Sequence, residues 1–552
     1  YASRGLGDVY KRQGYIYVVI VSFILAESLD KMRDLSGKEL GIMTAITGLY
    51  GLVNAFSDKL FVPSIYGAFG LLAATLIMLF LLNSDKITFS KKQFRGIVLG
   101  MTALVIFLNA KWFITSGDDS YTHLDTYVSA GDSKKKISGT ALKHLDEVPG
   151  ADTDEFYRST NLVTTGNLRS SSLLYGYNDV STFSSTLNGG IVNYNNAMGN
   201  CRWNIVSIYD YNFRTYLNTL ASVKYMGVAK KNTATIPYGY KKVQETKNKY
   251  YSIYENQYSL PLGYTYDKIV NTDRIDQYSA AEKQETTMLA AIVEDKDMDK
   301  NSNLTVATKL PLTAQKLKIK NIKLNGVSMT KDTIEIEKPG ATMKFSFEAP
   351  ANAETYLSLV GDIYAEKDAK EHFITARIKA PGVKYGHKFR IDAYTTGQKE
   401  YLFNLGYREG AVKTCTLKFV GTGTLKYKDL AIYSQTMSNY ADRVNALKEN
   451  SLQNAKAEKN TVTGNITVDK DKMLVVTLPY QKGWTAYVDG KKTDIQRVNY
   501  QYIGINLKKG THDIKLHYQL PGIKLAFMIT GCGIIAFVAI IIFNIVRKRR
   551  KN

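Results

Sequence analysis

Two residue patterns in this chain have the spacing of metal-binding or acid–base chemistry. Asp152 and Asp154 form an Asp-x-Asp pair, the spacing with which nucleotide-sugar transferases hold a metal ion, and the stretch "VDKDK" at residues 468–472 repeats it. Pairs of this kind are common in polar loops, so a solvated turn is the favoured interpretation. His512 and His517 lie five residues apart in a predicted strand and therefore face opposite sides of it. We predict no metal site, and no cofactor is evident.

A second stretch combines side chains that could hold a polar ligand. Residues 179–204, "DVSTFSSTLNGGIVNYNNAMGNCRWN", have too many aromatic residues for a linker and too many small polar residues for an ordinary core. Hydroxyl and amide groups bind polar ligands through hydrogen bonds, and aromatic rings pack against them. We therefore expect a ligand here. The candidate contacts are Ser181, Phe183, Ser184, Asn188 and Trp203.

Trp484 and Tyr487, in "GWTAYV", have two interpretations. Both rings could stack on the face of a sugar. Alternatively Trp484 anchors the core of a terminal β-sheet, which is the favoured interpretation for a Trp.

Composition limits the class of protein. The chain has 552 residues, a formal net charge of +22 and 3 cysteines. That length suggests roughly three or four folding units. So few cysteines exclude a disulfide-rich scaffold. Cys201 and Cys415 could pair, although free buried thiols are favoured. The net positive charge fits an anionic partner, and it fits equally well lysines that only solvate a β surface near anionic lipid.

Apolar segments near the two ends of the chain predict a membrane protein. Because about 20 apolar residues cross the hydrocarbon core, Phe61–Leu82 and Leu525–Val546 are long enough, and neither contains a charge. Phe94–Thr115 is also predicted to span, since its basic residues lie near its ends. Gly41–Ser57 is a weaker, Gly-rich candidate, and Tyr15–Ala26 is too short unless it is a truncated span.

Basic residues beside these segments predict their orientation. The tail "RKRRKN" at residues 547–552 and the segments at 27–40 and 83–96 contain Lys and Arg. Such residues stay on the cytoplasmic side of a membrane, and all three segments fall on one side if every span is real. Residues 116–522 then lie outside the cytoplasm. This location argues against a nucleic-acid partner and favours an anionic membrane or cell-wall polymer.

The exported region has the patterns of β-structure with a few helices. Residues 340–350, "GATMKFSFEAP", alternate apolar and polar residues as in a half-buried strand. Asn325-Gly326 predicts a type I′ turn between two short strands, and Asp489-Gly490 predicts a second turn. Residues 460–519 read as an antiparallel sheet or sandwich.

Two helices are expected among these strands. Ser279 and Glu282 form a predicted capping box at the start of "SAAEKQETTMLAAIV", residues 279–293. Residues 434–453 space Met, Tyr, Val and Leu as on a helix, and we expect this helix to join two β modules.

The first thirteen residues, "YASRGLGDVYKRQ", have no apolar stretch typical of a signal peptide. They resemble translated sequencing-adaptor sequence, and we set them apart as a non-native segment. The expected organisation is 1–13, the adaptor-like segment; 14–115, a transmembrane region with about four spans of which the first is truncated; 116–300, an extracytoplasmic α/β region; 301–433, an extracytoplasmic β module; 434–456, a linking helix; 457–522, a juxtamembrane β-sheet module; 523–546, a carboxyl-terminal transmembrane helix; and 547–552, a basic cytoplasmic tail.

An ordered set of stretches resembles the YfhO family of bacterial multi-pass membrane proteins. The most specific is "GWTAYVDGKKTDIQRVNYQYIGINLKKGTHDIKLHYQLPG", which precedes an apolar segment and a basic tail. The others, in order, are "FYR", "DVSTFSSTLN", "LASVKYMGV", "YENQYSLPLGYTYD" and "KQETTMLAAIV". The resemblance covers nearly all of the chain after residue 14.

This resemblance implies a GT-C type glycosyltransferase of the cell envelope. Such enzymes transfer a sugar from a polyprenyl-phosphate carrier to an acceptor on the outer face of the membrane, here lipoteichoic acid or a related cell-wall polymer. A catalytic carboxylate would activate the acceptor hydroxyl. The family pattern places this carboxylate in the first external loop, which these residues do not include, so no catalytic residue is assigned and the chain's own activity stays open. The implied fold is a set of GT-C-like but incomplete membrane spans, a large extracytoplasmic β-rich α+β region and one carboxyl-terminal transmembrane helix.

Three functions follow from these expectations. The leading one is the carboxyl-terminal part of the lipid-carrier-dependent glycosyltransferase, with the lipid bilayer, the lipid-linked sugar donor and an anionic cell-wall glycopolymer as partners. The second is a non-enzymatic, membrane-anchored surface protein that binds such a glycopolymer. The third is an accessory or transporter subunit for lipid-linked sugars, which a charged pair within the membrane would favour.

Overall fold

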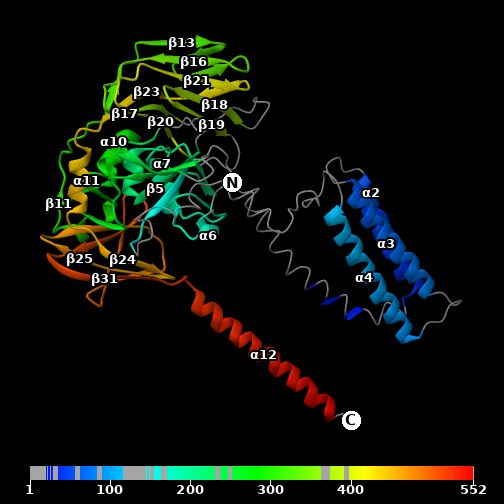
Figure 1. The fold of residues 1–552 in the computed structure, drawn as a ribbon. Helices are drawn as coiled ribbons and strands as arrows, with labels where there is room; N and C mark the ends of the chain where they lie inside the picture. The colour runs from blue at the N-terminus through cyan, green and yellow to red at the C-terminus, as the bar shows by residue number, and fades with distance from the viewer. Residues whose placement is uncertain are drawn as a thin grey trace. The chain divides into compact units, whose positions relative to one another are not determined.

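The computed structural model divides the chain into two compact units, residues 1–136 and 137–552 (Figure 1). It describes residues 20, 23–24, 27–28, 35–55, 62–83, 90–115, 145, 148, 155–162, 170, 172–229, 236–245, 251–361, 373–390 and 397–550. The first thirteen residues, and most of Tyr15–Ala26, lie outside this described part.

The first unit consists of helices α2 (Gly37–Ala55), α3 (Val62–Leu82) and α4 (Lys91–Thr115). The start of α2 is stabilised because Ser36 and Glu39 exchange backbone–side-chain hydrogen bonds, and Ser90 and Gln93 do the same before α4. The helices lie where the sequence predicts membrane spans. That they cross a membrane stays a prediction.

Helix α12 (Ile523–Arg549) has the properties of a membrane span. Within the described residues it is the one helix long and apolar enough to cross a bilayer. Its last turn holds Arg547, Lys548 and Arg549. Four residues separate its start from the end of the last β-strand at Tyr518.

The second unit begins with a mixed four-stranded sheet in the order β1-β5-β7-β6, in which only β1 and β5 are parallel. A small sheet has the order β2-β4-β3. Their bounds are β1 Arg158–Leu162, β2 Thr182–Phe183, β3 Trp203–Asn204, β4 Ser207–Ile208, β5 Val223–Ala229, β6 Tyr240–Glu245 and β7 Tyr251–Asn256, with helices α6 Ser172–Tyr175, α7 Gly189–Ala197 and α8 Thr215–Leu220.

A β-sandwich follows, built from the sheets β12-β23-β17-β20 and β13-β16-β21-β18-β19 with a short sheet β14-β15-β22 beside them (Figure 1). The bounds are β12 Gln315–Leu317, β13 Asn321–Asn325, β14 Val327–Met329, β15 Thr333–Ile336, β16 Thr342–Ser346, β17 Ala353–Val360, β18 Phe373–Ala380, β19 Val383–Arg390, β20 Glu400–Arg408, β21 Thr414–Val420, β22 Gly423–Lys426 and β23 Asp429–Thr436. Met343 and Phe345 of β16 are buried and Lys344 is exposed, which confirms the predicted alternation.

The hairpin predicted at Asn325-Gly326 is wrong. Gly326 has a positive φ, but β13 pairs with β16 while β14 pairs with β15. A type I′ turn needs positive φ at both central residues, and only Gly326 of the two has it. The chain therefore passes from one sheet to another at this point.

The last strands form two sheets whose inner faces share a core. The first has the order β11-β9-β10-β29-β30-β26-β8 and the second, called here the carboxyl-terminal sheet, has the order β24-β25-β31-β27-β28. The bounds are β8 Gly263–Tyr266, β9 Lys268–Asn271, β10 Ala291–Val293, β11 Thr305–Val306, β24 Gln453–Glu458, β25 Thr461–Val468, β26 Lys472–Pro479, β27 Trp484–Val488, β28 Lys491–Thr493, β29 Gln496–Val498, β30 Tyr502–Leu507 and β31 Gly510–Tyr518, with α9 Thr272–Asp276, the 3-10 turns Asp295–Asp297 and Asp299–Asn301, and α10 and α11 described next.

Both predicted helices of this region are present but shorter than expected. Helix α10 (Ala280–Thr286) has the capping box of Ser279 and Glu282, as predicted. It ends at Thr286 because residues 291–293 pair with strands β9 and β29 instead. Helix α11 (Tyr440–Lys448) buries Tyr440, Val444 and Leu447, whereas residues 434–436 belong to β23.

Candidate functional site

The small sheet β2-β4-β3 brings together part of the stretch in which the sequence predicts a polar ligand. Thr182 and Trp203 both pair with Ile208, so the chain around Phe183 lies near Trp203. Phe183 is 53% exposed. Ser181 donates from its backbone N–H and from its hydroxyl to the carboxylate of Asp179, at 2.9 Å each.

The other candidates of this stretch make hydrogen bonds within the protein. The hydroxyl oxygen of Ser184 accepts from the backbone N–H of Thr186 at 3.3 Å. Asn188 caps α7 and donates to the carbonyl of Tyr480 at 3.2 Å. The indole N–H of buried Trp203 donates to Gln398 at 3.1 Å. These polar atoms are thus engaged in local structure, and ligand binding by the five candidates stays a prediction.

The carboxyl of Asp179 beside Ser181 is perturbed. Burial raises its pKa to about 7, and the hydrogen bonds from Ser181 only partly oppose this shift. The nearby charge of Asp210 raises it further, although Arg202 pairs with Asp210 at 3.0 Å. Asp179 can therefore hold a proton near neutral pH, which free aspartate cannot.

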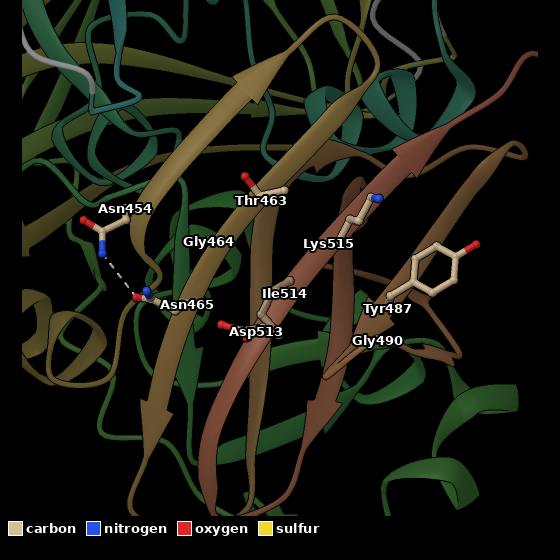
Figure 2. Close-up of a pocket in the computed structure, with 9 residues that line it drawn as sticks. All are labelled: Asn454, Thr463, Gly464, Asn465, Tyr487, Gly490, Asp513, Ile514 and Lys515. Atoms are coloured by element: carbon tan, nitrogen blue, oxygen red, sulfur yellow. Dashed lines mark hydrogen bonds between the residues drawn. The ribbon is translucent and has the colours of Figure 1, made fainter.

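A groove lies on the outer face of the carboxyl-terminal sheet (Figure 2). It has a volume of about 760 Å³, within the range of ligand sites. The groove is lined by Asn454, Thr463, Gly464, Asn465, Tyr487, Gly490, Asp513, Ile514 and Lys515. Figure 2 shows Lys515 between Thr463 and Tyr487, and Asn465 near Asp513.

Strand alternation explains why polar groups gather on this face. In β25, Val462, Ile466 and Val468 point into the core shared with β26 and β30, so Thr463 and Asn465 point outward. In β31, Ile514 and Leu516 are buried, which places Asp513 and Lys515 on the outer face. A polar outer face and an apolar inner face are typical of an antiparallel sheet.

The strand register sets the outward side chains in rows. Thr463 pairs with Lys456 and with Lys515, and Tyr487 pairs with Lys515 and with Lys492. One row therefore crosses all five strands. A neighbouring row contains Gln453, Asn465 and Asp513.

The turn at Asp489-Gly490 contributes Gly490 to the lining of the groove. Asp489 and Gly490 have φ values of 52° and 75°, the positive values that a type I′ turn needs, so the predicted turn is confirmed. The Asp489 carboxylate contacts His512 at 2.8 Å and accepts from the backbone N–H of Asp513 at 2.8 Å. These contacts fix the turn beside β31. His512 lowers the pKa of Asp489.

The structure separates the two aromatic residues of "GWTAYV". Trp484 packs against the core of this module and its ring lies 5.2 Å from that of Tyr518. Tyr487, three residues along the same strand, lines the groove. Core packing is therefore confirmed for Trp484, and a ring available for stacking is present at Tyr487.

Of the two Asp-x-Asp pairs predicted to be solvated turns, the structure describes only Asp469 and Asp471. Asp469 contacts Lys472 at 3.2 Å and Asp471 contacts Lys508 at 2.8 Å. Residues 152 and 154 lie outside the described part of the chain. Among the described residues no group of three or more His, Cys, Asp or Glu side chains is placed to hold a metal ion. Cys201 and Cys415 are free and buried.

Of the polar side chains that line the groove, the sequence predicts only Tyr487 as a candidate contact. Their types are ordinary for a strand surface, and residues 453–515 contain them at irregular intervals. The available signal is the alternation in β25 and β31, which identifies an outward face but not its partners across the sheet.

Comparisons with known proteins identify relatives of the whole chain. A model of the family described as "Bacterial membrane protein YfhO" matches residues 9–530. The YfhO protein of Bacillus subtilis (strain 168) is 25% identical over 576 aligned residues, which cover 99% of this chain and 61% of that protein. The chain thus spans about three fifths of the length of this relative.

Two solved structures show a weaker likeness. A CBM35 domain from Paenibacillus barcinonensis is 10% identical and matches 22% of this chain and 97% of its own, with a TM-score of 0.16. The mycobacterial arabinofuranosyltransferase AftD is 10% identical and matches 91% of this chain and 58% of its own, with a TM-score of 0.20. At these scores neither likeness supports an argument about fold or function.

Proposed function

Because the chain belongs to the YfhO family of bacterial membrane proteins, we propose that it is part of a membrane glycosyltransferase of the cell envelope. The enzyme would take a sugar from a polyprenyl-phosphate carrier and add it to a cell-wall polymer, such as lipoteichoic acid, on the outer face of the membrane. In this proposal α2, α3 and α4 are among its membrane spans, and the β-rich region handles the acceptor.

The observation that carries the proposal is the extent of the family match, which runs from the helices of the first unit through the β-modules into α12. The basic last turn of α12 supports a cytoplasmic carboxyl terminus. A cytoplasmic end of α12 would leave the preceding β-sheets outside, where cell-wall polymers lie. The polar groove on the carboxyl-terminal sheet supports a sugar-containing partner.

The test is deletion of the chromosomal gene that encodes this chain, followed by measurement of the sugar content of each wall polymer and of the polyprenyl-phosphate sugar pool. We expect one polymer to lose a sugar substituent and the lipid-linked donor to accumulate. Complementation with the intact gene restores the substituent. Unchanged sugar content in every polymer would overturn the proposal.

The groove also favours a second function, a membrane-anchored surface protein that binds anionic glycopolymer without modifying it. The same deletion separates the two. In the second case the polymer keeps its sugars but is released more readily from the cell surface, which extraction of the polymer from intact cells measures.

A further inference from the structure

We propose that the outer face of the carboxyl-terminal sheet is the binding site for a polyol-phosphate polymer such as poly(glycerol phosphate), aligned along the row Lys456, Thr463, Lys515, Tyr487 and Lys492. The inference deepens the proposed function by locating where the acceptor docks. It rests on that function for the role of the polymer as an acceptor.

Positive charges are evenly spaced along the row. Neighbouring strands lie about 4.8 Å apart, so Lys456, Lys515 and Lys492, which occupy alternate strands, have backbones about 10 Å apart. The full row crosses five strands and spans about 19 Å. Three cations separated by neutral side chains match a chain in which anionic groups alternate with neutral ones.

Two of these cations are available to a ligand. Neither Lys492 nor Lys515 forms an ion pair with any residue that the structure describes. A lysine ammonium offers donors on a flexible stem and binds phosphate oxygens by charge-assisted hydrogen bonds. Lys492 and Lys515 therefore present charges that no ion pair within the described residues occupies.

The side chains between and beside the cations suit the neutral parts of such a polymer. Tyr487 lies between Lys515 and Lys492 and has an aromatic face on which a sugar or polyol segment can pack. The parallel row offers the amide of Asn465 and the carboxylate of Asp513, which accept hydrogen bonds from hydroxyl groups. Because Asp513 repels phosphate, it favours placing the anionic groups on the lysine row and the hydroxyls over Asn465.

The composition of the face does not suit an apolar protein partner. No large hydrophobic side chain between residues 453 and 518, all of which the structure describes, is classed as exposed. Protein interfaces have aromatic and apolar residues at their centre, whereas this face offers hydroxyl, amide and charged groups. Charge complementarity therefore favours a hydrophilic polyanion.

The face is also held near the end of α12. Strand β31 ends at Tyr518 and α12 begins at Ile523, so residues 519–522 keep these ends within about 18 Å of each other. Lys515 is three residues before the strand ends, about 10 Å along it. A polymer anchored to the outer leaflet can reach this row.

The experiment uses the full chain in nanodiscs of phosphatidylcholine, which is zwitterionic with no net charge, and three probes: poly(glycerol phosphate), neutral dextran, and vesicles that contain anionic phosphatidylglycerol. Binding is measured by fluorescence anisotropy for the polymers and by co-flotation for the vesicles. The test variant is Lys492→Gln with Lys515→Gln. The matched control is Lys379→Gln with Lys384→Gln, which removes two lysines that face each other on β18 and β19.

We expect the test variant to raise the Kd for poly(glycerol phosphate) about 2- to 25-fold, since each of the two exposed charge contacts is worth about 1.4- to fivefold. The control variant should change it less than twofold. Tyr487→Ala should weaken binding whereas Tyr487→Phe should not, and dextran should bind weakly to all forms. Unchanged thermal unfolding midpoints will show that the variants are folded.

Several outcomes would overturn the inference. These are no binding of poly(glycerol phosphate), equal losses in the test and control variants, or binding of dextran as tightly as the charged polymer. A test variant that loses binding only to anionic vesicles would assign the row to lipid headgroups instead. The lysine variant could lose polymer binding while deletion of the gene leaves the sugars of every polymer unchanged. That combination would refute the glycosyltransferase proposal and support the docking site.

Discussion

Replacing Arg443 with Met should destabilise the second unit strongly, because it leaves a buried carboxylate without its cation. Arg443 of α11 contacts Glu285 of α10 at 2.5 Å, with the two side chains 8% and 0% exposed. Glu285 also accepts hydrogen bonds from the backbone N–H groups of Thr313 and Ala314 at 2.6 and 2.8 Å. Breaking a buried pair by removing one partner costs about 3–5 kcal/mol of unfolding free energy.

An exposed pair of nearly the same length is the matched control. Lys316 contacts Asp429 at 2.6 Å, but the side chains are 53% and 47% exposed. Water and salt screen such a pair, so Lys316→Met should cost about 0–1 kcal/mol. Unfolding in urea, followed by tryptophan fluorescence of the full chain in detergent, gives both changes in midpoint.

A double variant tests the cause of the loss. Glu285→Gln combined with Arg443→Met removes the buried charge but keeps an amide oxygen that can accept from Thr313 or Ala314. If the unpaired charge is what destabilises Arg443→Met, the double variant should be more stable than that single variant. Equal losses for Arg443→Met and Lys316→Met, or no recovery in the double variant, would refute the reasoning.

Three further changes test the pH response, the packing and a helix cap. Burial raises the pKa of Glu354 to about 7, so the folded state holds this proton more tightly than the unfolded one. The resulting contribution to stability is complete below the usual pKa and is lost as pH rises through about 7. The urea midpoint of Glu354→Gln should therefore rise relative to that of the parent as the pH increases from 5 to 8. A difference between the two midpoints that stays constant over this range would contradict the prediction. Gly464→Ala would bring a Cβ within 2.8 Å of Leu452 and should cost about 1–3 kcal/mol in the same assay. Gly386→Ala, whose nearest atom is 3.8 Å away, is the control and should cost less. Asn188→Ala removes the cap of α7 and should cost about 1 kcal/mol; a midpoint equal to that of the parent would show that the cap adds nothing.

Local patterns in the sequence predict several elements well because their causes are local. The capping box of Ser279 and Glu282, the alternation in β16 and the turn at Asp489-Gly490 depend on residues within a few positions of one another. The hairpin predicted at Asn325-Gly326 is wrong because the pairing of its strands is not decided locally. Its flanking strands are paired by β16 and β15, and those tertiary contacts outweigh the local preference for a hairpin.

The lengths of the helices were overestimated where strands compete for the same residues. An apolar run such as residues 289–293 can be buried equally well in a helix or in a central strand. The structure pairs Ala291, Ile292 and Val293 with β9, where the carboxyl end of α10 would otherwise continue. Pairing across the sheet depends on residues far along the chain, so the sequence pattern near α10 does not reveal it.

The lysine row shows most clearly where sequence-based reasoning stops. Lys456, Thr463, Tyr487, Lys492 and Lys515 are separated by intervals of 7, 24, 5 and 23 residues, which fit neither a helical nor a strand period. Only the register of four strand pairs converts these intervals into neighbours, and a shift of one residue in β31 would turn Lys515 toward the core. Burial of Ile514 and Leu516 opposes that shift, so the apolar face of β31 is what holds the charged face in place. Stability of this core and polymer binding by the row are therefore linked, and a substitution that lets β31 slip should impair both.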